Sequence, residues 1–160
     1  MSKPEYRYAE LRADVEGRTL EGTVMTYGDT ATLPFGKETV SAGAFGDLSS
    51  ADVILNEMHD RARPLARTGS GLELVDSAEQ LTIRATLPET RAANDVLELI
   101  KAGVYRGLSV EMFIRQSDMV NGIRRVTEAR LGGIGVVDKP AYPQSAVSAR
   151  SEAETDNRWW

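Results

Sequence analysis

The sequence of 160 residues has no cysteine and only one histidine, His59. The absence of cysteine excludes disulfides, thiolate metal sites and a cysteine nucleophile, and it leaves the redox compartment undetermined. Catalytic zinc sites use several nitrogen or sulfur ligands, so a metal-dependent hydrolase built on His59, Asp60 and scattered carboxylates is disfavoured. We therefore expect no cofactor and no metal.

Long apolar runs and an excess of positive charge are also missing. No run approaches the roughly 20 apolar residues that cross a bilayer, and the start, MSKPEY, has no apolar signal core. We therefore expect a cytoplasmic protein without a membrane partner. Asp and Glu number 24 against 19 Lys and Arg, a net charge of -5. This balance argues against a specific nucleic-acid partner, although Arg61, Arg63 and Arg67 form a local basic stripe.

The remaining composition is that of an ordinary globular domain. Apolar residues make up 41% of the chain and charged residues 27%, and the length suits one domain with its own core. We expect one domain over residues 1–149 and a polar, disordered tail over residues 150–160, RSEAETDNRWW.

Alternation of apolar and polar residues predicts a mainly β protein. It is clearest in residues 80–87, where Leu81, Ile83 and Ala85 share one face. Further strands are expected over residues 6–13, 18–27, 37–40, 52–58, 72–75, 107–116, 123–131 and 145–149. The first two, separated by turn-forming residues, are expected to form a hairpin.

The clearest helix is predicted over residues 89–102. Its apolar positions recur at three- and four-residue steps, Thr90 is a candidate N-cap, and Gly103 would end it. Asn121-Gly122 predicts a tight turn between two strands. The fold class that follows is α+β to mainly β, an antiparallel or mixed β-barrel surrounded by a few helices.

The segment GLSVEM, residues 107–112, places Ser109 in an apolar strand entered through a glycine. Such a strand can hold a serine nucleophile at a fixed angle, although an ordinary strand hydroxyl has the same pattern. If the chain performs serine chemistry through an imidazole, His59 is the single candidate for the base.

Four segments in order resemble a known family: GTVMTYGDTATLPFGKETVSAGAF, NEMHD, GLSVEM and VTEARLGGIGVVDKPAYPQSAV. They are similar to the signatures of the prohead maturation proteases of tailed bacteriophages, relatives of the herpesvirus assembly protease. The resemblance covers residues 18–147 and implies a serine endopeptidase on a β-barrel with helices around it.

The resemblance also implies roles for individual residues. Ser109 matches the nucleophile, His59 the general base, and Glu128 the acidic third member that holds the imidazole tautomer. The herpesvirus relatives use a histidine in that third role, and this chain has no second histidine. Apart from the resemblance, the glycine-rich stretch 132–135 can let backbone approach a substrate closely, so the N–H groups of Gly132 and Gly133 are candidates for the oxyanion hole. A bulge or tight packing is the alternative reason for such glycines.

Other carboxylates compete with Glu128 for the third role. Glu57 and Glu111 each lie two residues from a catalytic candidate, and Asp60 adjoins His59. The chain also departs from the family's Glu-x-Ser pattern, because Gly133-Ile134-Gly135 stands in its place.

For partners, the resemblance implies the major capsid protein and scaffold segments, with self-association and self-cleavage, inside an assembling procapsid in the bacterial cytoplasm. The tail would then dock on the capsid shell or be removed autocatalytically. A different reading is a catalytically inactive scaffold or interaction domain of the same fold, against which stands the retention of Ser109, His59 and Glu128.

Overall fold

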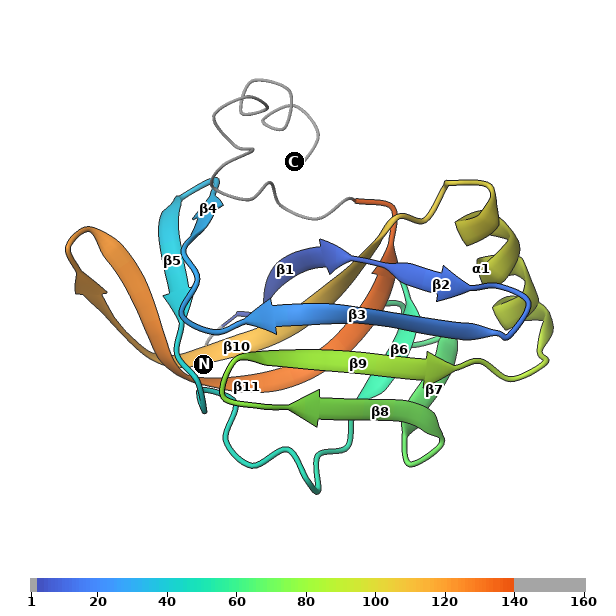
Figure 1. Ribbon diagram of the computed structural model, residues 1–160, viewed down its shortest axis with the longest axis horizontal. Coiled ribbons are helices and arrows are strands. Elements are labelled where there is room, and N and C mark those ends of the chain that lie inside the picture. The colour runs from blue at the N-terminus through green and yellow to red at the C-terminus, as the bar shows by residue number, and fades with distance from the viewer. Residues whose placement is uncertain (1–2, 140–160) are drawn as a thin grey trace.

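The computed structural model describes residues 3–139, which form eleven strands and one helix (Figure 1). The strands are β1 (Glu5–Glu10), β2 (Arg12–Asp14), β3 (Thr19–Thr26), β4 (Ala31–Leu33), β5 (Gly36–Val40), β6 (Ile54–Glu57), β7 (Pro64–Thr68), β8 (Gly71–Asp76), β9 (Gln80–Thr86), β10 (Gly107–Val120) and β11 (Ile123–Val137), and the helix is α1 (Arg91–Lys101).

All strands belong to one mixed sheet that curls into a nearly closed barrel (Figure 1). Its order is β1-β10-β11-β6-β7-β8-β9-β3-β2, and β5, which pairs with β4, lies beside β11. β5 and β6 run parallel to β11, and β7 runs parallel to β8. The end strand β1 approaches β3, the strand next to the other end, at Gly22 of β3, where a Cβ atom would lie 2.5 Å from the carbonyl oxygen of Glu10. Glycine is needed there because any larger residue would hold the two strands apart.

The core fills the barrel with side chains from alternating strand positions. Leu20, Leu81, Ile83 and Ala85 are fully buried, as the alternation predicted, because adjacent residues of a strand point to opposite faces. The expected helix is confirmed over Arg91–Lys101, and α1 adds its apolar face to this core.

Two local signals are also confirmed. The Ala93 N–H donates to Thr90 Oγ1 at 3.1 Å, so Thr90 is the N-cap of α1. Asn121 and Gly122 form the turn between β10 and β11 with φ of 53° and 79°, the left-handed conformation that these residues adopt readily. Local sequence therefore determines where these elements begin and turn.

The structure differs from the expected architecture at two points. The expected hairpin over residues 6–13 and 18–27 exists only as the β2–β3 pair, because β1 leaves β3 and pairs with β10. Within residues 3–139 there is one helix rather than a few. The strand predicted at residues 145–149 and the tail at 150–160 lie outside the described residues. Alternation fixes which face of a strand is buried but not which strand it pairs with.

Candidate active site

Ser109 lies on the middle one of three neighbouring strands, β1, β10 and β11. Ser109 of β10 lies opposite Tyr8 of β1 and opposite Gly135 of β11. Directly opposite residues of antiparallel strands project to the same face, so these three share one face of the sheet. The adjacent residues Val110 and Ile134 project to the other face, into the barrel, and are fully buried. Ser109 therefore lies on the outer face of the barrel wall, where its side chain is nonetheless fully covered.

His59 reaches the same face from a turn that follows β6. Met58 and His59 have φ of 54° and 56°, two successive non-glycine residues in the left-handed region. The Met58 N–H donates to the Val136 carbonyl at 2.9 Å, which ties the turn to β11. Backbone of this kind costs free energy and persists only where its surroundings fix it, a situation common at active sites.

The imidazole of His59 lies over Gly135. A Cβ atom at Gly135 would be 3.0 Å from both Cδ2 and Nε2 of the ring, so the absence of a side chain there makes room for the imidazole. Since Ser109 is the cross-strand neighbour of Gly135, its Cβ lies about 5 Å from that same point. The fold thus brings His59 and Ser109, far apart in sequence, to one glycine.

Three buried side-chain atoms have no hydrogen-bond partner within residues 3–139: Asn56 Oδ1 of β6, which lies opposite Gly135, and two atoms of the predicted catalytic residues, Ser109 Oγ and His59 Nε2. Buried polar atoms are nearly always paired, and exceptions cluster at reactive sites. Of the last two atoms, one is a hydroxyl that can be a nucleophile and the other a ring nitrogen that can accept its proton. Hydrogen bonds between such groups often tighten only when substrate binds.

Burial lowers the pKa of His59 below its ordinary value, and the charge of Glu111 partly opposes this. The imidazole is therefore neutral at neutral pH, the form that a general base requires.

Glu111 occupies the next row of the same face, opposite Tyr6 of β1 and Gly133 of β11. The Tyr6 hydroxyl donates to Glu111 Oε2 at 3.0 Å, and the Tyr6 ring packs on His59 with 4.9 Å between ring centroids. Burial and the hydrogen bond to Glu111 raise the pKa of Tyr6, so the phenol keeps its proton. Tyr6 therefore contacts both the imidazole and the carboxylate.

A break in the strand register makes space for that carboxylate. Glu111 faces Gly133, but Met112 faces Leu131, so Gly132 is the extra residue of a β-bulge. A Cβ atom at Gly132 would lie 2.5 Å from Glu111 Oε1. Gly132 and Gly133, expected at the oxyanion hole, thus border Glu111, whereas Ser109 is paired with Gly135.

The other candidate carboxylates near the histidine are engaged elsewhere. Glu57 is buried and accepts hydrogen bonds from the Tyr105 hydroxyl and, at 3.4 Å, from Arg63 Nη1. Burial and Glu57 together raise the pKa of Tyr105 to about 12. Asp60 is exposed and accepts from the Ala62 N–H at 2.9 Å, which stabilises its own turn.

The structure does not bring Glu128 to the histidine. Glu128 is exposed and lies opposite Gln116. Seven positions of β11 separate it from Gly135, about 20 Å along a strand. Its neighbours are instead the residues of a separate surface depression that includes Asp47 and Arg115. The 15-residue length of β11 is the reason, since residues of one strand can lie at opposite ends of the barrel.

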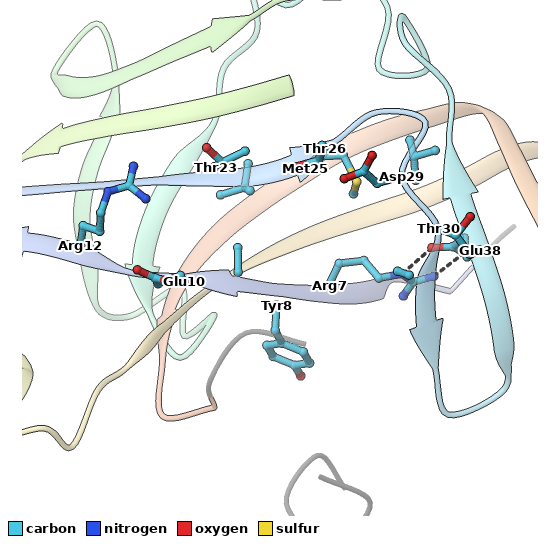
Figure 2. Close-up of a pocket in the computed structure, with 14 residues that line it drawn as sticks. Arg7, Tyr8, Glu10, Arg12, Thr23, Met25, Thr26, Asp29, Thr30 and Glu38 are labelled. Carbon is cyan, nitrogen blue, oxygen red and sulfur yellow. Dashed lines mark hydrogen bonds and ion pairs between the residues drawn. The ribbon is translucent and has the colours of Figure 1, made fainter. Parts of the chain in front are cut away.

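A cavity of about 380 Å³ lies between β1 and β3 (Figure 2). Arg7 and Glu38 form an ion pair at one end of it. Neither Ser109 nor His59 lines this cavity. Figure 2 shows the Tyr8 ring directed away from β3, in keeping with its place on the outer face beside Ser109.

Residues 3–139 contain no group of three or more histidine, aspartate or glutamate side chains arranged to bind a metal ion. In the same part of the chain, the helix is too short and too polar to cross a membrane.

Comparison with known proteins decides the family. A family model described as "Caudovirus prohead serine protease" matches residues 6–158. The chain belongs to this family. As a prohead serine protease it is a peptidase of phage capsid assembly. The family predicted from the sequence is therefore confirmed, and the matched residues extend beyond the range 18–147 that the four segments covered. No curated protein matches the sequence.

A solved structure, that of the bacteriophage T4 capsid assembly protease, gp21, has a similar fold. The TM-score is 0.63 at 15% sequence identity, and the alignment covers 85% of this prohead protease and 98% of that chain. The predicted β-barrel class is thereby confirmed.

Proposed function

We propose that the chain is a serine endopeptidase in which Ser109 is the nucleophile and His59 the general base. The observation that carries this proposal is that Ser109 and His59 both border Gly135, and that Ser109 Oγ and His59 Nε2 are buried without a hydrogen-bond partner among residues 3–139. A strand serine with a structural role would have its hydroxyl satisfied by a neighbouring backbone group.

The reaction follows from this placement. Ser109 Oγ attacks the scissile carbonyl carbon while His59 Nε2 accepts the hydroxyl proton, which gives a tetrahedral intermediate. His59 then donates that proton to the leaving amine as the C–N bond breaks, and an ester on Ser109 remains. A water molecule, deprotonated by the same nitrogen, hydrolyses the ester and restores both residues.

The substrates we propose are scaffold segments or N-terminal extensions of the major capsid protein, with the protease chain itself as a further substrate inside the procapsid. Membership of a prohead protease family supports this assignment. The competing function, an inactive scaffold of the same fold, predicts no role for the unpartnered Ser109 hydroxyl.

The test is co-expression with the capsid protein encoded beside it, followed by intact mass measurement. Ser109→Ala and His59→Ala should each reduce cleavage by about 10⁴-fold or more, because removing either member of such a pair removes most of the catalysis. Ser117→Ala, an exposed serine of the same strand, should cleave like the unaltered chain. Cleavage that survives Ser109→Ala would end the nucleophile assignment, and no cleavage by any form would favour the scaffold.

A further inference from the structure

Glu111 is the carboxylate that the fold places beside the proposed base. His59 lies over Gly135 of β11, and Glu111 lies over Gly132 and Gly133 of the same strand. Positions two apart on one face of a strand are about 7 Å from each other, so the imidazole and the carboxylate occupy adjacent sites. The side chain of Glu111 arises from β10, two residues after Ser109, on the same face.

The space that Glu111 fills is built for a side chain entering from β10. The bulge at Gly132 and the absence of a side chain at Gly133 leave an opening beside the histidine. A side chain at Gly132 would meet the carboxylate at 2.5 Å. Bulges next to active sites commonly redirect a side chain, and here the bulge lets Glu111 extend over β11.

Tyr6 fixes this carboxylate relative to the ring. Its hydroxyl donates to Glu111 Oε2, and its ring packs against the imidazole at 4.9 Å. The hydrogen bond occupies Oε2, and Oε1 is the oxygen directed over Gly132. One carboxylate oxygen is therefore held by Tyr6 while the group as a whole lies beside His59.

We propose that Glu111, held by Tyr6, is the acidic residue that positions His59, so that the nucleophile and the acid both come from strand β10. This inference rests on the proposed function. Glu111 would accept a hydrogen bond from His59 Nδ1–H, which keeps Nε2 free to accept the Ser109 proton and stabilises the imidazolium during attack. Glu111 and Tyr6 are positioning residues, because they act through His59.

The direct test changes the charge of Glu111 while keeping its shape. Glu111→Gln should reduce kcat by about 100-fold to 10⁴-fold with little change in KM, because the wrong histidine tautomer is then favoured. Glu111→Asp keeps the charge and should retain more activity than Glu111→Gln. Glu98→Gln on the exposed face of α1 is the matched control and should leave kcat unchanged.

A second readout does not depend on turnover. Because the chain has a single histidine, its ring signals in NMR spectra are unambiguous, and a Ser109→Ala background prevents self-cleavage. In that background Glu111→Gln should lower the pKa of His59, since the Glu111 charge raises it, and should deplete the Nδ1–H tautomer. Tyr6→Phe keeps the ring contact, loses the hydrogen bond, and should reduce kcat by about 10-fold.

The outcomes separate this inference from the function on which it rests. Loss of cleavage in Ser109→Ala together with full activity and an unchanged His59 titration in Glu111→Gln would overturn the role of Glu111 alone. Persistence of cleavage in Ser109→Ala would overturn the protease mechanism itself. A loss of kcat in Glu128→Gln without a loss in Glu111→Gln would assign the acid to Glu128.

Discussion

Two residues of the candidate site have unusual backbone conformations, and these determine where the histidine ring lies. Met58 and His59 are both left-handed, although neither has the conformational freedom of glycine. The hydrogen bond from Met58 to Val136 holds this turn against β11. The resulting position sets both the contact of the imidazole with Gly135 and the degree of its burial.

Burial of His59 predicts how activity depends on pH. The folded protein depresses the pKa of His59 below 6.5, and only the neutral imidazole can accept the Ser109 proton. A plot of kcat/KM should therefore be flat near neutral pH and fall in acid with a midpoint below 6.5. The measurement is peptide cleavage from about pH 4 to pH 8. A midpoint above the ordinary histidine value would contradict the burial of the base.

The closeness of Gly135 to the imidazole predicts that a side chain at position 135 lowers activity. In Gly135→Ala the new methyl group would lie 3.0 Å from the imidazole, closer than ordinary contact, so the ring must move away. We expect kcat to fall by about 10-fold or more, since small displacements of a catalytic group cost rate steeply. Gly133→Ala is the comparison, because its methyl group would lie 3.6 Å from Ile54 O and 4.0 Å from Glu111 Oε1, both ordinary contacts, and it should lose less. Equal losses in the two variants would argue against a steric role for Gly135.

Among the elements, strand β1 contributes two tyrosines that border the candidate site. It pairs with β10 and so places Tyr6 beside Glu111 and Tyr8 beside Ser109. A buried ion-pair network ties it to two other strands. Glu38 of β5 accepts from Arg7 of β1 at 2.7 and 2.8 Å and from Arg124 of β11 at 2.6 and 3.0 Å.

This network predicts a large loss of stability when its central charge is removed. The Glu38 side chain is 2% exposed and that of Arg7 9%, so Glu38→Gln removes the buried counter-ion of Arg7 and leaves only Glu5, whose side chain is 32% exposed and lies 2.8 Å away. The expected cost is about 3 kcal/mol of unfolding free energy. Asp118→Asn, which breaks the exposed pair with Arg125, should leave the unfolding free energy almost unchanged, because solvent screens such a pair. Urea unfolding measures both, and similar values for the two variants would contradict the importance of burial.

The whole molecule combines a barrel with a projecting hairpin. The first part of β10 and the last part of β11 are buried in the barrel wall, whereas the turn between them extends beyond it (Figure 1). Met119 near the turn is 66% exposed, and Val110 is fully buried. The segments that carry the candidate site thus belong to the most buried part of the molecule.

This division predicts two classes of amide hydrogen exchange. The amides of Val110, Ile134 and Val136 should exchange only when the whole barrel unfolds. Those of residues 116–122 should exchange through local opening, because this part of the hairpin is exposed and precedes the residues of β11 that pair with β5. Exchange measured against denaturant concentration distinguishes the two. Exchange of Val110 at the rate of the hairpin would show that the site opens separately from the barrel.

The sequence by itself determined the features that depend on neighbours a few residues away. The alternation at Leu81 and Ile83, the cap at Thr90 and the turn at Asn121-Gly122 all appear where they were predicted, since each reflects local backbone preference or the two-residue period of a strand. The order of four short segments was enough to indicate the family.

Only the tertiary structure decided which side chains meet. Tyr6 had no signal in the sequence, because 105 residues separate it from Glu111 and only the pairing of β1 with β10 brings them together. The same holds for the acidic residue. Glu128, Glu57 and Glu111 have the same chemistry, and their distance from His59 depends on strand register and on the bulge at Gly132, which arise from contacts across the whole barrel.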